Sequence, residues 1–550
     1  MLHASPSLDP SSFLDMQLGC DPFCEPPIFF NTQPPALSFA AFTSTPPIQD
    51  VAMTAPTQTK ELSVKKALLS PNRHHLKLAI DKELDKMLRI YKAFSPISYN
   101  QIPADAVRIH SRMFTKEKFL GYGSFDKFSA RLAAGGNSQP SDSFFDTFAP
   151  TVDESINKLI VAAFYADAIA HNYVADMVMC DFDVPGAFLN IPLDKSNCPR
   201  PIVMRLQPDL PHPLAGSWVL LHKGVYGLRQ SNCMFSKDLS AQFLAAGYIP
   251  SEADSCVYTK TLSSDPSKKC IVSMHVDDGQ VVHNCPALYQ QLVTILEQRY
   301  GPLTHNASTK SYLGQAITVH SSGRVSYSME GYIRRLCSEH RLLTVSHTPS
   351  DATLFLPSSN LTPVNPLQYQ KLMGGLIYCL KTRHDIRKEV VHLSSKCVSP
   401  CISDTNKALR VLAYLNHTKH YGPSYFTTAG AVLCAHVDAS YGVHADGSSH
   451  SGYYISIGPD SAPICCYSAA QRSCVSVSSM EAEYVALSSC GRKLAHYRHF
   501  LSTIGFKQTE PSIIYEDNKS AIKLASTPDI PRKSRHSFGR FLGDFWKNKN

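Results

Sequence analysis

The sequence predicts an α+β chain that ends in a separate α/β domain, and two observations support this. First, two apolar strands each run into an aspartate: 177–180 leads to Asp183, and 270–275 leads to Asp277. Second, the segment from Val432 onwards shows the order strand–strand–strand–helix–strand–helix, which is typical of α/β domains. We therefore expect the last segment to be separable from what precedes it.

The bulk composition excludes several classes of protein. Hydrophobic residues make up 43% of the 550 residues and charged residues 18%, which suits globular domains with buried cores. The net charge of +8 is compatible with a nucleic-acid partner but does not establish one. The chain starts without a basic and apolar leader, and its longest apolar stretch, 159–170, is too short to span a membrane. The 17 cysteines lack zinc spacing. We expect a soluble intracellular protein with reduced, mostly buried thiols and no membrane partner.

The elements before the final domain are predicted in order. Residues 1–70 hold ten of the 37 prolines and show no period, so we expect a disordered leader. An amphipathic helix over 77–91 places Leu76, Ile80, Leu84, Leu88 and Tyr91 on one side. Further helices are expected at 150–170, at 232–246 and within 368–418, and the Pro-rich segment 349–366 looks like a connection.

Three aspartates follow the two apolar strands. Asp183 closes one strand, and Asp277 and Asp278 lie at the turn that leaves the other. Nucleotidyl transfer needs two divalent ions, and Mg²⁺ prefers oxygen ligands such as these carboxylates. If the strands are neighbours, the three carboxylates converge. The alternative is that aspartate at a strand end is ordinary turn chemistry.

The residues around these aspartates resemble a known family. The segment 183–190, Asp-Val-Pro-Gly-Ala-Phe-Leu-Asn, is similar to a motif of copia-type retrotransposon reverse transcriptases, and His275-Val276-Asp277-Asp278 is similar to its Y-V-D-D. Other segments resemble motifs of the same family in the same order: 128–136, 146–150, 225–230, 254–260 and 312–314. The resemblance covers about residues 75–545.

The resemblance implies a palm-and-fingers polymerase followed by an α/β RNase H-like domain. It places the fingers and palm at 75–330, a thumb or connection at 331–425 and the RNase H-like domain at 426–550. Asp183, Asp277 and Asp278 would bind the catalytic Mg²⁺ or Mn²⁺ ions, helped by the backbone carbonyl of Val184.

The same resemblance assigns a dNTP site to three residues. Arg131 would clamp the triphosphate, a role that suits its fixed fork of donors. Gln230 would line the pocket, and Phe188 would exclude a ribose 2′-hydroxyl. The alternative for Phe188 is a plain core aromatic.

A second set of carboxylates resembles the RNase H site of the family. His436–Gly442 places Asp438 at the first ligand position, Ser478–Tyr484 makes Glu481 the helical ligand, and Tyr515–Ala521 makes Asp517 the third. Glu483 is about 200° round the helix from Glu481, so we expect it to face elsewhere. The fourth acidic position of the family holds Phe538, which cannot bind metal, and Asp544 lies six residues on. An RNase H fold kept as a scaffold without cleavage therefore stays open.

These assignments predict a reverse transcriptase with a fused RNase H domain. Its partners would be an RNA template, a DNA primer, the RNA–DNA hybrid, dNTPs and other retrotransposon Pol products. It would act in cytoplasmic virus-like particles, in the nucleus, or in both. The alternative is a degenerate or co-opted remnant that binds nucleic acid without catalysis. That alternative is motivated by four departures from the family motifs: Ser129, Gly135, His275 and Phe538.

Overall fold

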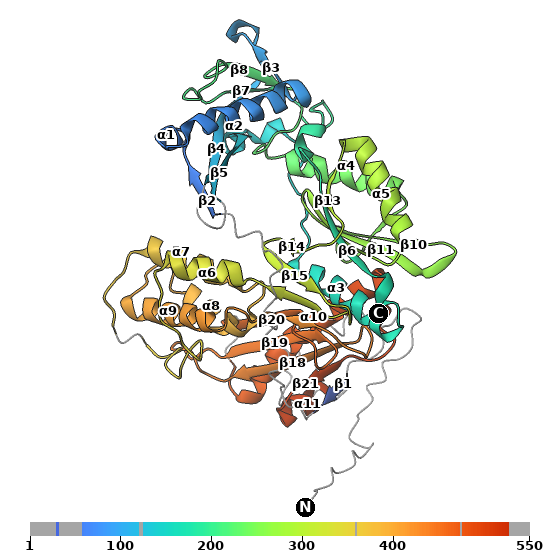
Figure 1. The fold of residues 1–550 in the computed structure, drawn as a ribbon. Helices are drawn as coiled ribbons and strands as arrows, with labels where there is room; N and C mark the ends of the chain where they lie inside the picture. The colour runs from blue at the N-terminus through green and yellow to red at the C-terminus, as the bar shows by residue number, and fades with distance from the viewer. Residues whose placement is uncertain (1–28, 32–57, 120–124, 358–359, 473–475, 527–550) are drawn as a thin grey trace, which may run out of the picture.

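The structure is a computed structural model in which four sheets and their helices form three connected regions (Figure 1). It describes residues 29–31, 58–119, 125–357, 360–472 and 476–526. No helix in these ranges is long and apolar enough to cross a lipid bilayer. Most of the described cysteines are buried, as predicted.

The first sheet stands at the top of Figure 1 and has the order β2-β4-β7-β8-β3, with β5 paired to β4. Its strands are β2 (Gln58–Leu62), β3 (Phe94–Ile97), β4 (Val107–Phe119), β5 (Phe125–Ala134), β7 (Ile202–Arg205) and β8 (Trp218–Leu221). Two helices lie beside it, α1 (Val64–Ala67) and α2 (Arg73–Asp85). This arrangement corresponds to the predicted fingers.

The predicted amphipathic helix is confirmed over its first part. Leu76, Ile80 and Leu84 of α2 are buried in the core of this sheet. From Lys86 to Ile90 the chain widens into a π-helical turn. This wider turn buries Met87, whereas the predicted Leu88 stays partly exposed. The 3.6-residue period used for the prediction fails where the turn changes.

The second sheet has the order β13-β6-β12-β11-β10-β9 and corresponds to the predicted palm. Its strands are β6 (Val178–Asp183), β9 (Ile249–Pro250), β10 (Val257–Leu262), β11 (Asp265–His275), β12 (Asp278–His283) and β13 (Thr304–Asn306). Its helices are α3 (Glu154–Ala170), α4 (Ser231–Ala245) and α5 (Pro286–Tyr300). Alternate side chains of a strand face opposite sides. Val272 therefore packs with α4 and α5, and Ile271 packs with α3.

A small sheet and a helical bundle follow. The sheet contains β14 (Ser311–Tyr312), β15 (Gln315–Val319), β16 (Val325–Ser328) and β17 (Ser424–Tyr425). The bundle contains α6 (Glu330–Glu339), α7 (Pro366–Cys379), α8 (Arg387–Ser394) and α9 (Ile402–His417), which share one apolar core. The helices predicted within 368–418 are therefore confirmed.

The last region is a five-stranded sheet with the order β1-β21-β18-β19-β20. Its elements from Leu433 onwards are β18 (Leu433–Ser440), β19 (His450–Ile457), β20 (Cys465–Ala470), α10 (Ser479–Thr503), β21 (Ile513–Tyr515) and α11 (Lys519–Ser526). The predicted order of elements is thus confirmed, and β21 runs parallel to β18 while β18 and β19 are antiparallel.

The described parts of residues 1–70 correct the prediction of a disordered leader. Strand β1 (Phe29–Asn31) pairs in parallel with β21, while β2 and α1 belong to the first sheet. An edge strand presents unpaired backbone groups, and β1 satisfies those on one side of β21. Such a short strand has no detectable period in a Pro-rich sequence. The remainder of 1–57 lies outside the described residues.

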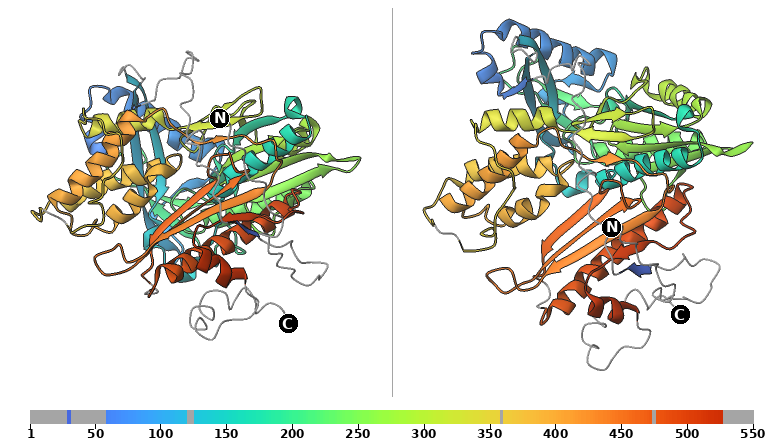
Figure 2. Two further views of the ribbon diagram at one scale, coloured as in Figure 1. Left: turned by 90° about the horizontal axis from the view of Figure 1, so that it is seen from below. Right: turned by 60° about the horizontal axis from the view of Figure 1, so that its bottom comes forward.

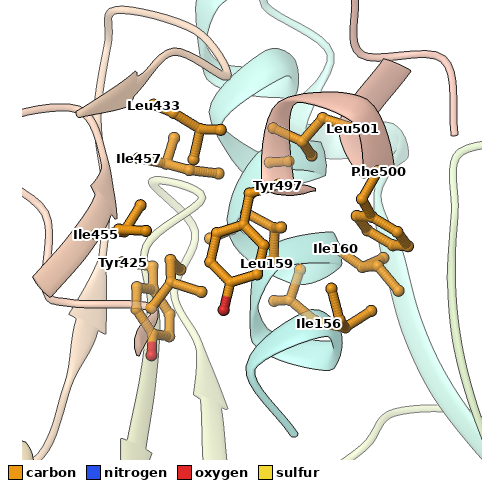
Figure 3. Close-up of a cluster of buried hydrophobic side chains, with 14 of the residues drawn as sticks. Ile156, Leu159, Ile160, Tyr425, Leu433, Ile455, Ile457, Tyr497, Phe500 and Leu501 are labelled. Atoms are coloured by element: carbon orange, nitrogen blue, oxygen red, sulfur yellow. The ribbon is translucent and has the colours of Figure 1, made fainter. Parts of the chain in front are cut away.

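The final region is not separable in the predicted way, because it shares one core with the palm helix α3. Figure 3 shows Ile156, Leu159 and Ile160 of α3 facing side chains of α10 and of the last sheet. Those partners are Leu433, Ile455, Ile457, Tyr497, Phe500 and Leu501. Helix α3 is buried against the palm sheet on one side and the last region on the other, which explains its nearly unbroken apolar sequence. The right-hand view of Figure 2 shows α3, in teal, between the palm and the last sheet.

Candidate active sites

The first candidate site lies where β6 ends beside the hairpin of β11 and β12. Asp278 is directly opposite Asp183 in the sheet register, and His275 pairs with Asp278 to close a two-residue turn. The backbone N–H of Val184 donates to the carbonyl of Asp277 at 3.1 Å. The predicted convergence of Asp183, Asp277 and Asp278 is therefore present.

The hairpin turn carries backbone strain. Val276 has a φ of 61°, in the left-handed region that a β-branched residue rarely adopts. Asp277 does not share this positive φ, so the turn is of the type that normally takes glycine at its first position. The sequence keeps valine there, next to two acidic residues, and such strain tends to persist at functional sites.

The electrostatics of this site favour cation binding. Burial, together with the charges of Asp277 and Asp278, raises the pKa of Asp183 to about 6. Burial and the charge of Asp277 also raise the pKa of Asp278. Arg131 and Lys86 act in the opposite sense on Asp183. Carboxylates that repel one another in this way suit a divalent ion, and hard oxygen donors are the ligands that Mg²⁺ prefers.

Arg131 faces the aspartates from the first sheet. It lies on β5 opposite Phe114, and Glu83 of α2 fixes the strand by accepting from the backbone N–H of Leu132 at 3.1 Å. The Arg131 guanidinium lies 4.2 Å from the ring centroid of Tyr226, a cation–π contact. Arg131 is thus held between an aromatic ring and the acidic cluster.

Tyr226 is a site residue that the sequence analysis did not single out, although it belongs to a quoted motif. Gly227, with a φ of 88°, lets its loop lie against β5, because a side chain there would meet the Ala134 carbonyl. Ala134 donates its N–H to the Tyr226 carbonyl at 2.7 Å. The Tyr226 ring also packs edge-on against Phe188 at 5.2 Å. Phe188 is half-buried and contacts Phe235 as well, so it is both a wall of the site and part of the core.

The structure does not direct Gln230 toward this cluster. Its side chain is 1% exposed at the start of α4. Its amide oxygen accepts from Gln139 at 3.2 Å, and its amide nitrogen donates to the Cys198 sulfur at 3.9 Å. Both ends of the amide are therefore engaged inside the protein, and a role in dNTP binding stays a prediction.

The second candidate site lies on the last sheet and is more compact. Oxygens of Asp438, Glu483 and Asp517 lie within 4.8 Å of one another, the only such group of three possible metal ligands in the described part of the chain. Asp438 is on β18, Glu483 is on α10, and Asp517 follows β21. This cluster matches the chemistry of a two-metal hydrolase.

The choice of Glu481 as the helical ligand was wrong. Glu481 is the third residue of α10 and caps its start: the Val477 N–H donates to its carboxylate at 2.8 Å. Its own N–H donates to the Ser478 hydroxyl at 3.2 Å. Its neighbour Glu483 takes the site position. The helical spacing correctly separated the two glutamates but did not say which one faces β18.

Burial and repulsion act strongly on Glu483. Burial, followed by the charges of Glu516, Asp438 and Asp517, raises the pKa of Glu483 to about 8. Burial is also the main cause that raises the pKa of Glu516 to about 7. Glu516 is a fourth carboxyl at this site. The sequence analysis missed it, because only its neighbour Asp517 matches a ligand position of the family motif. Phe538 and Asp544 lie outside the described residues.

Comparison with known proteins shows similarity to reverse transcriptases and transposon Pol proteins. Residues 99–350 match the family described as reverse transcriptase (RNA-dependent DNA polymerase). The chain is 26% identical over 446 residues to a retrovirus-related Pol polyprotein from transposon RE1 of Arabidopsis thaliana, which covers 79% of this chain and 29% of that protein. It is 28% identical over 313 residues to a putative transposon Ty5-1 protein of Saccharomyces cerevisiae, covering 56% of this chain and 98% of that protein.

A solved structure is also similar in part. A foamy viral protease–reverse transcriptase in complex with double-stranded DNA matches 85% of this chain and 68% of that one, with 13% identity and a TM-score of 0.49. The chain spans less than a third of the length of the transposon RE1 and RE2 Pol polyproteins, at 29% and 28%. Taken together, residues 99–350 match the reverse transcriptase family, and most of the chain is similar to retrovirus-related Pol polyproteins of transposons.

Proposed function

We propose that the chain copies RNA and DNA templates by extending a DNA primer with dNTPs. The observation that carries this proposal is the convergence of Asp183, Asp277 and Asp278 at the end of β6 and the β11–β12 turn. Arg131 on the facing sheet supports it, because it supplies a fixed cation beside the acidic cluster. The sequence match to reverse transcriptases over residues 99–350 agrees with this function.

The residues around the cluster have distinct roles in this proposal. The three aspartates, with the carbonyl of Val184, would hold two divalent ions, Mg²⁺ or Mn²⁺. Bound there, these ions would stabilise the charge on the attacking and leaving oxygens. Arg131 binds the triphosphate of the incoming dNTP and orients it toward the aspartates, and Tyr226 keeps the guanidinium in place. Phe188 limits the room beside the sugar. Catalysis then depends mainly on positioning and electrostatics.

Primer extension tests this function directly. Full-length protein is incubated with an RNA template, a DNA primer, dNTPs and Mg²⁺ or Mn²⁺, beside the double variant Asp277→Asn and Asp278→Asn. Extension by the wild type that vanishes in the variant supports the proposal. Folded wild-type protein that binds primer–template without extending it contradicts the proposal and favours the binding-only remnant.

We further propose that the last region cleaves the RNA strand of the RNA–DNA hybrid. The compact cluster of Asp438, Glu483 and Asp517 supports this, because two-metal hydrolysis needs such a set of carboxylates. Release of fragments from labelled RNA in a hybrid, with Asp438→Asn as the control, measures the activity. A fold kept only as a scaffold would show no cleavage in either protein.

A further inference from the structure

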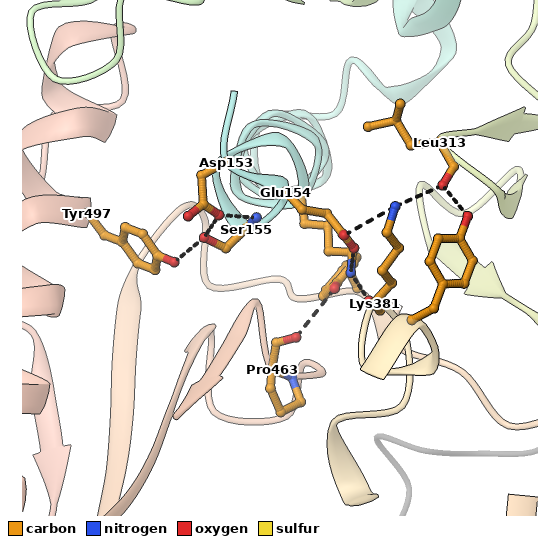
Figure 4. Close-up of polar contacts among 10 residues, drawn as sticks. Asp153, Glu154, Ser155, Leu313, Lys381, Pro463 and Tyr497 are labelled. Carbon is orange, nitrogen blue, oxygen red and sulfur yellow. Dashed lines mark hydrogen bonds and ion pairs between the residues drawn. The ribbon is translucent and has the colours of Figure 1, made fainter. Parts of the chain in front are cut away.

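A cavity of about 550 Å³ lies where the palm, the helical bundle and the last sheet meet, away from both candidate active sites. Its walls come from the start of α3, the end of α7, the start of α8, β19, β20 and α10. Figure 4 shows part of this junction, with Asp153, Glu154, Ser155 and Lys381 near its edge.

The charges in the walls do not balance. Four cationic side chains line the cavity, against two carboxylates; the cations are Lys158, Lys381, Arg387 and Lys493, and the carboxylates are Asp153 and Glu154. Glu154 forms ion pairs with two of these cations. Its carboxylate oxygens lie 2.8 Å from Lys158 Nζ and 3.8 Å from Lys381 Nζ. Asp153 accepts from the backbone and hydroxyl of Ser155. An excess of positive charge is therefore left inside a partly enclosed space.

Arg387 forms no ion pair with any described carboxylate. Its Nε atom is buried without a hydrogen-bond partner among the described residues, and no carboxylate in that part of the chain forms an ion pair with its guanidinium. It is the first residue of α8, where the positive end of the helix dipole adds to the repulsion. Arg387 is partly buried, and withdrawing a charge from water without a partner is costly, so this position favours an anion.

His384 gives a second, independent indication. Both ring nitrogens of His384 line the same cavity wall and are buried without a partner among the described residues. Burial and the nearby charges of Lys158 and Arg387 hold the pKa of His384 well below its ordinary value, so the ring is neutral and carries one N–H donor. That donor and the unpartnered Nε–H of Arg387 can both donate to the same ligand.

We propose that this cavity binds a phosphate-bearing anion, held by Arg387, His384 and Lys493. Phosphate oxygens accept several hydrogen bonds, and the fork of an arginine matches them in pairs. The anion would connect the start of α8 with β20 and α10, and so would tie the helical bundle to the last sheet. Either a free phosphate or a phosphate of a nucleic-acid backbone has this chemistry.

Thermal unfolding of the full chain tests the proposal. Wild type, Arg387→Gln and the matched control Lys388→Gln are titrated with inorganic pyrophosphate in EDTA, at an ionic strength kept constant with chloride. Lys388 is the neighbour of Arg387, is half-exposed and lies outside the cavity lining. A parallel series uses a short single-stranded oligonucleotide in place of pyrophosphate.

The expected result is a saturable rise in the melting temperature of the wild type and the control, with at least tenfold weaker binding by Arg387→Gln. Without phosphate, Arg387→Gln should melt at the same temperature as the wild type or above it, because it removes a partly buried charge that has no ion-pair partner among the described residues. Loss of affinity for pyrophosphate assigns a free anion, and loss for the oligonucleotide alone assigns a backbone phosphate. Equal responses of all three proteins to both ligands, or an Arg387→Gln variant destabilised to the same extent with and without ligand, would overturn the proposal.

Discussion

Replacing Glu483 with glutamine should raise the stability of the metal-free protein and abolish RNA cleavage. Glu483 is 6% exposed, and burial raises its pKa from 4.5 to about 8. Between pH 4.5 and about 8, the Glu483 carboxyl therefore keeps its proton in the folded state and has lost it in the unfolded chain. Stability from this group is complete below pH 4.5 and is lost as the pH rises through 8.

The size of the effect follows from the shift. About 3.5 pKa units at 1.36 kcal/mol per unit correspond to roughly 5 kcal/mol lost by the wild type between pH 4.5 and 9. Glutamine stays neutral and mimics the protonated acid, so Glu483→Gln should escape most of this loss. The assay is urea unfolding in EDTA at pH 4.5 and pH 9.

Glu481→Gln is the matched control for this prediction. Glutamine still offers an oxygen to the Val477 N–H, so stability should change by less than about 1 kcal/mol. In Mg²⁺, Glu483→Gln should lower hybrid cleavage by at least about a hundredfold, since even residues that only orient a metal ligand contribute 10–100-fold. A wild-type pH profile for Glu483→Gln, or cleavage lost in Glu481→Gln and kept in Glu483→Gln, would refute the reasoning.

Three further predictions address the palm and its contacts. Val276→Gly should raise the free energy of unfolding by about 1 kcal/mol in urea titrations, because glycine relieves the positive φ of 61°; a destabilised variant would contradict the strained turn. Arg131→Ala should raise the KM for dNTPs by about 10- to 100-fold in primer extension, which corresponds to the free energy of a charge-assisted hydrogen bond. An unchanged KM would show that Arg131 does not bind the dNTP. Leu159→Ala should cost about 2–5 kcal/mol and lower the melting temperature of the palm and the last region together in differential scanning calorimetry. Separate transitions would show that the two regions do not share a core.

The fold was predictable wherever a local pattern carried it. Strand β6 and helix α10 follow from apolar runs and helical periodicity, and the aspartates at strand ends were correctly expected to meet. The pairing of β1 with β21 was not predictable, because three residues carry no period and their partner lies far along the chain.

The site residues were hardest to predict where a side chain could take either of two structural roles. Glu481 and Glu483 are both acidic and both lie in the first turns of α10, and only tertiary packing decides which one caps the helix. Gln230 matches a family motif, yet its amide is bonded inside the protein. Tyr226 came to notice only as one letter of a motif, since its contact with Arg131 joins strand β5 to a loop far along the chain.

The position of α3 between two regions affects how a gene copy of this kind decays. A premature stop codon just after the helical bundle would leave the aspartates of the palm intact in the sequence. It would also remove α10 and the last sheet, and so expose the apolar face formed by Ile156, Leu159 and Ile160. A large exposed apolar patch promotes aggregation. Truncation would thus yield an aggregation-prone chain in place of a smaller folded one, so a single nonsense mutation would eliminate both proposed activities at once.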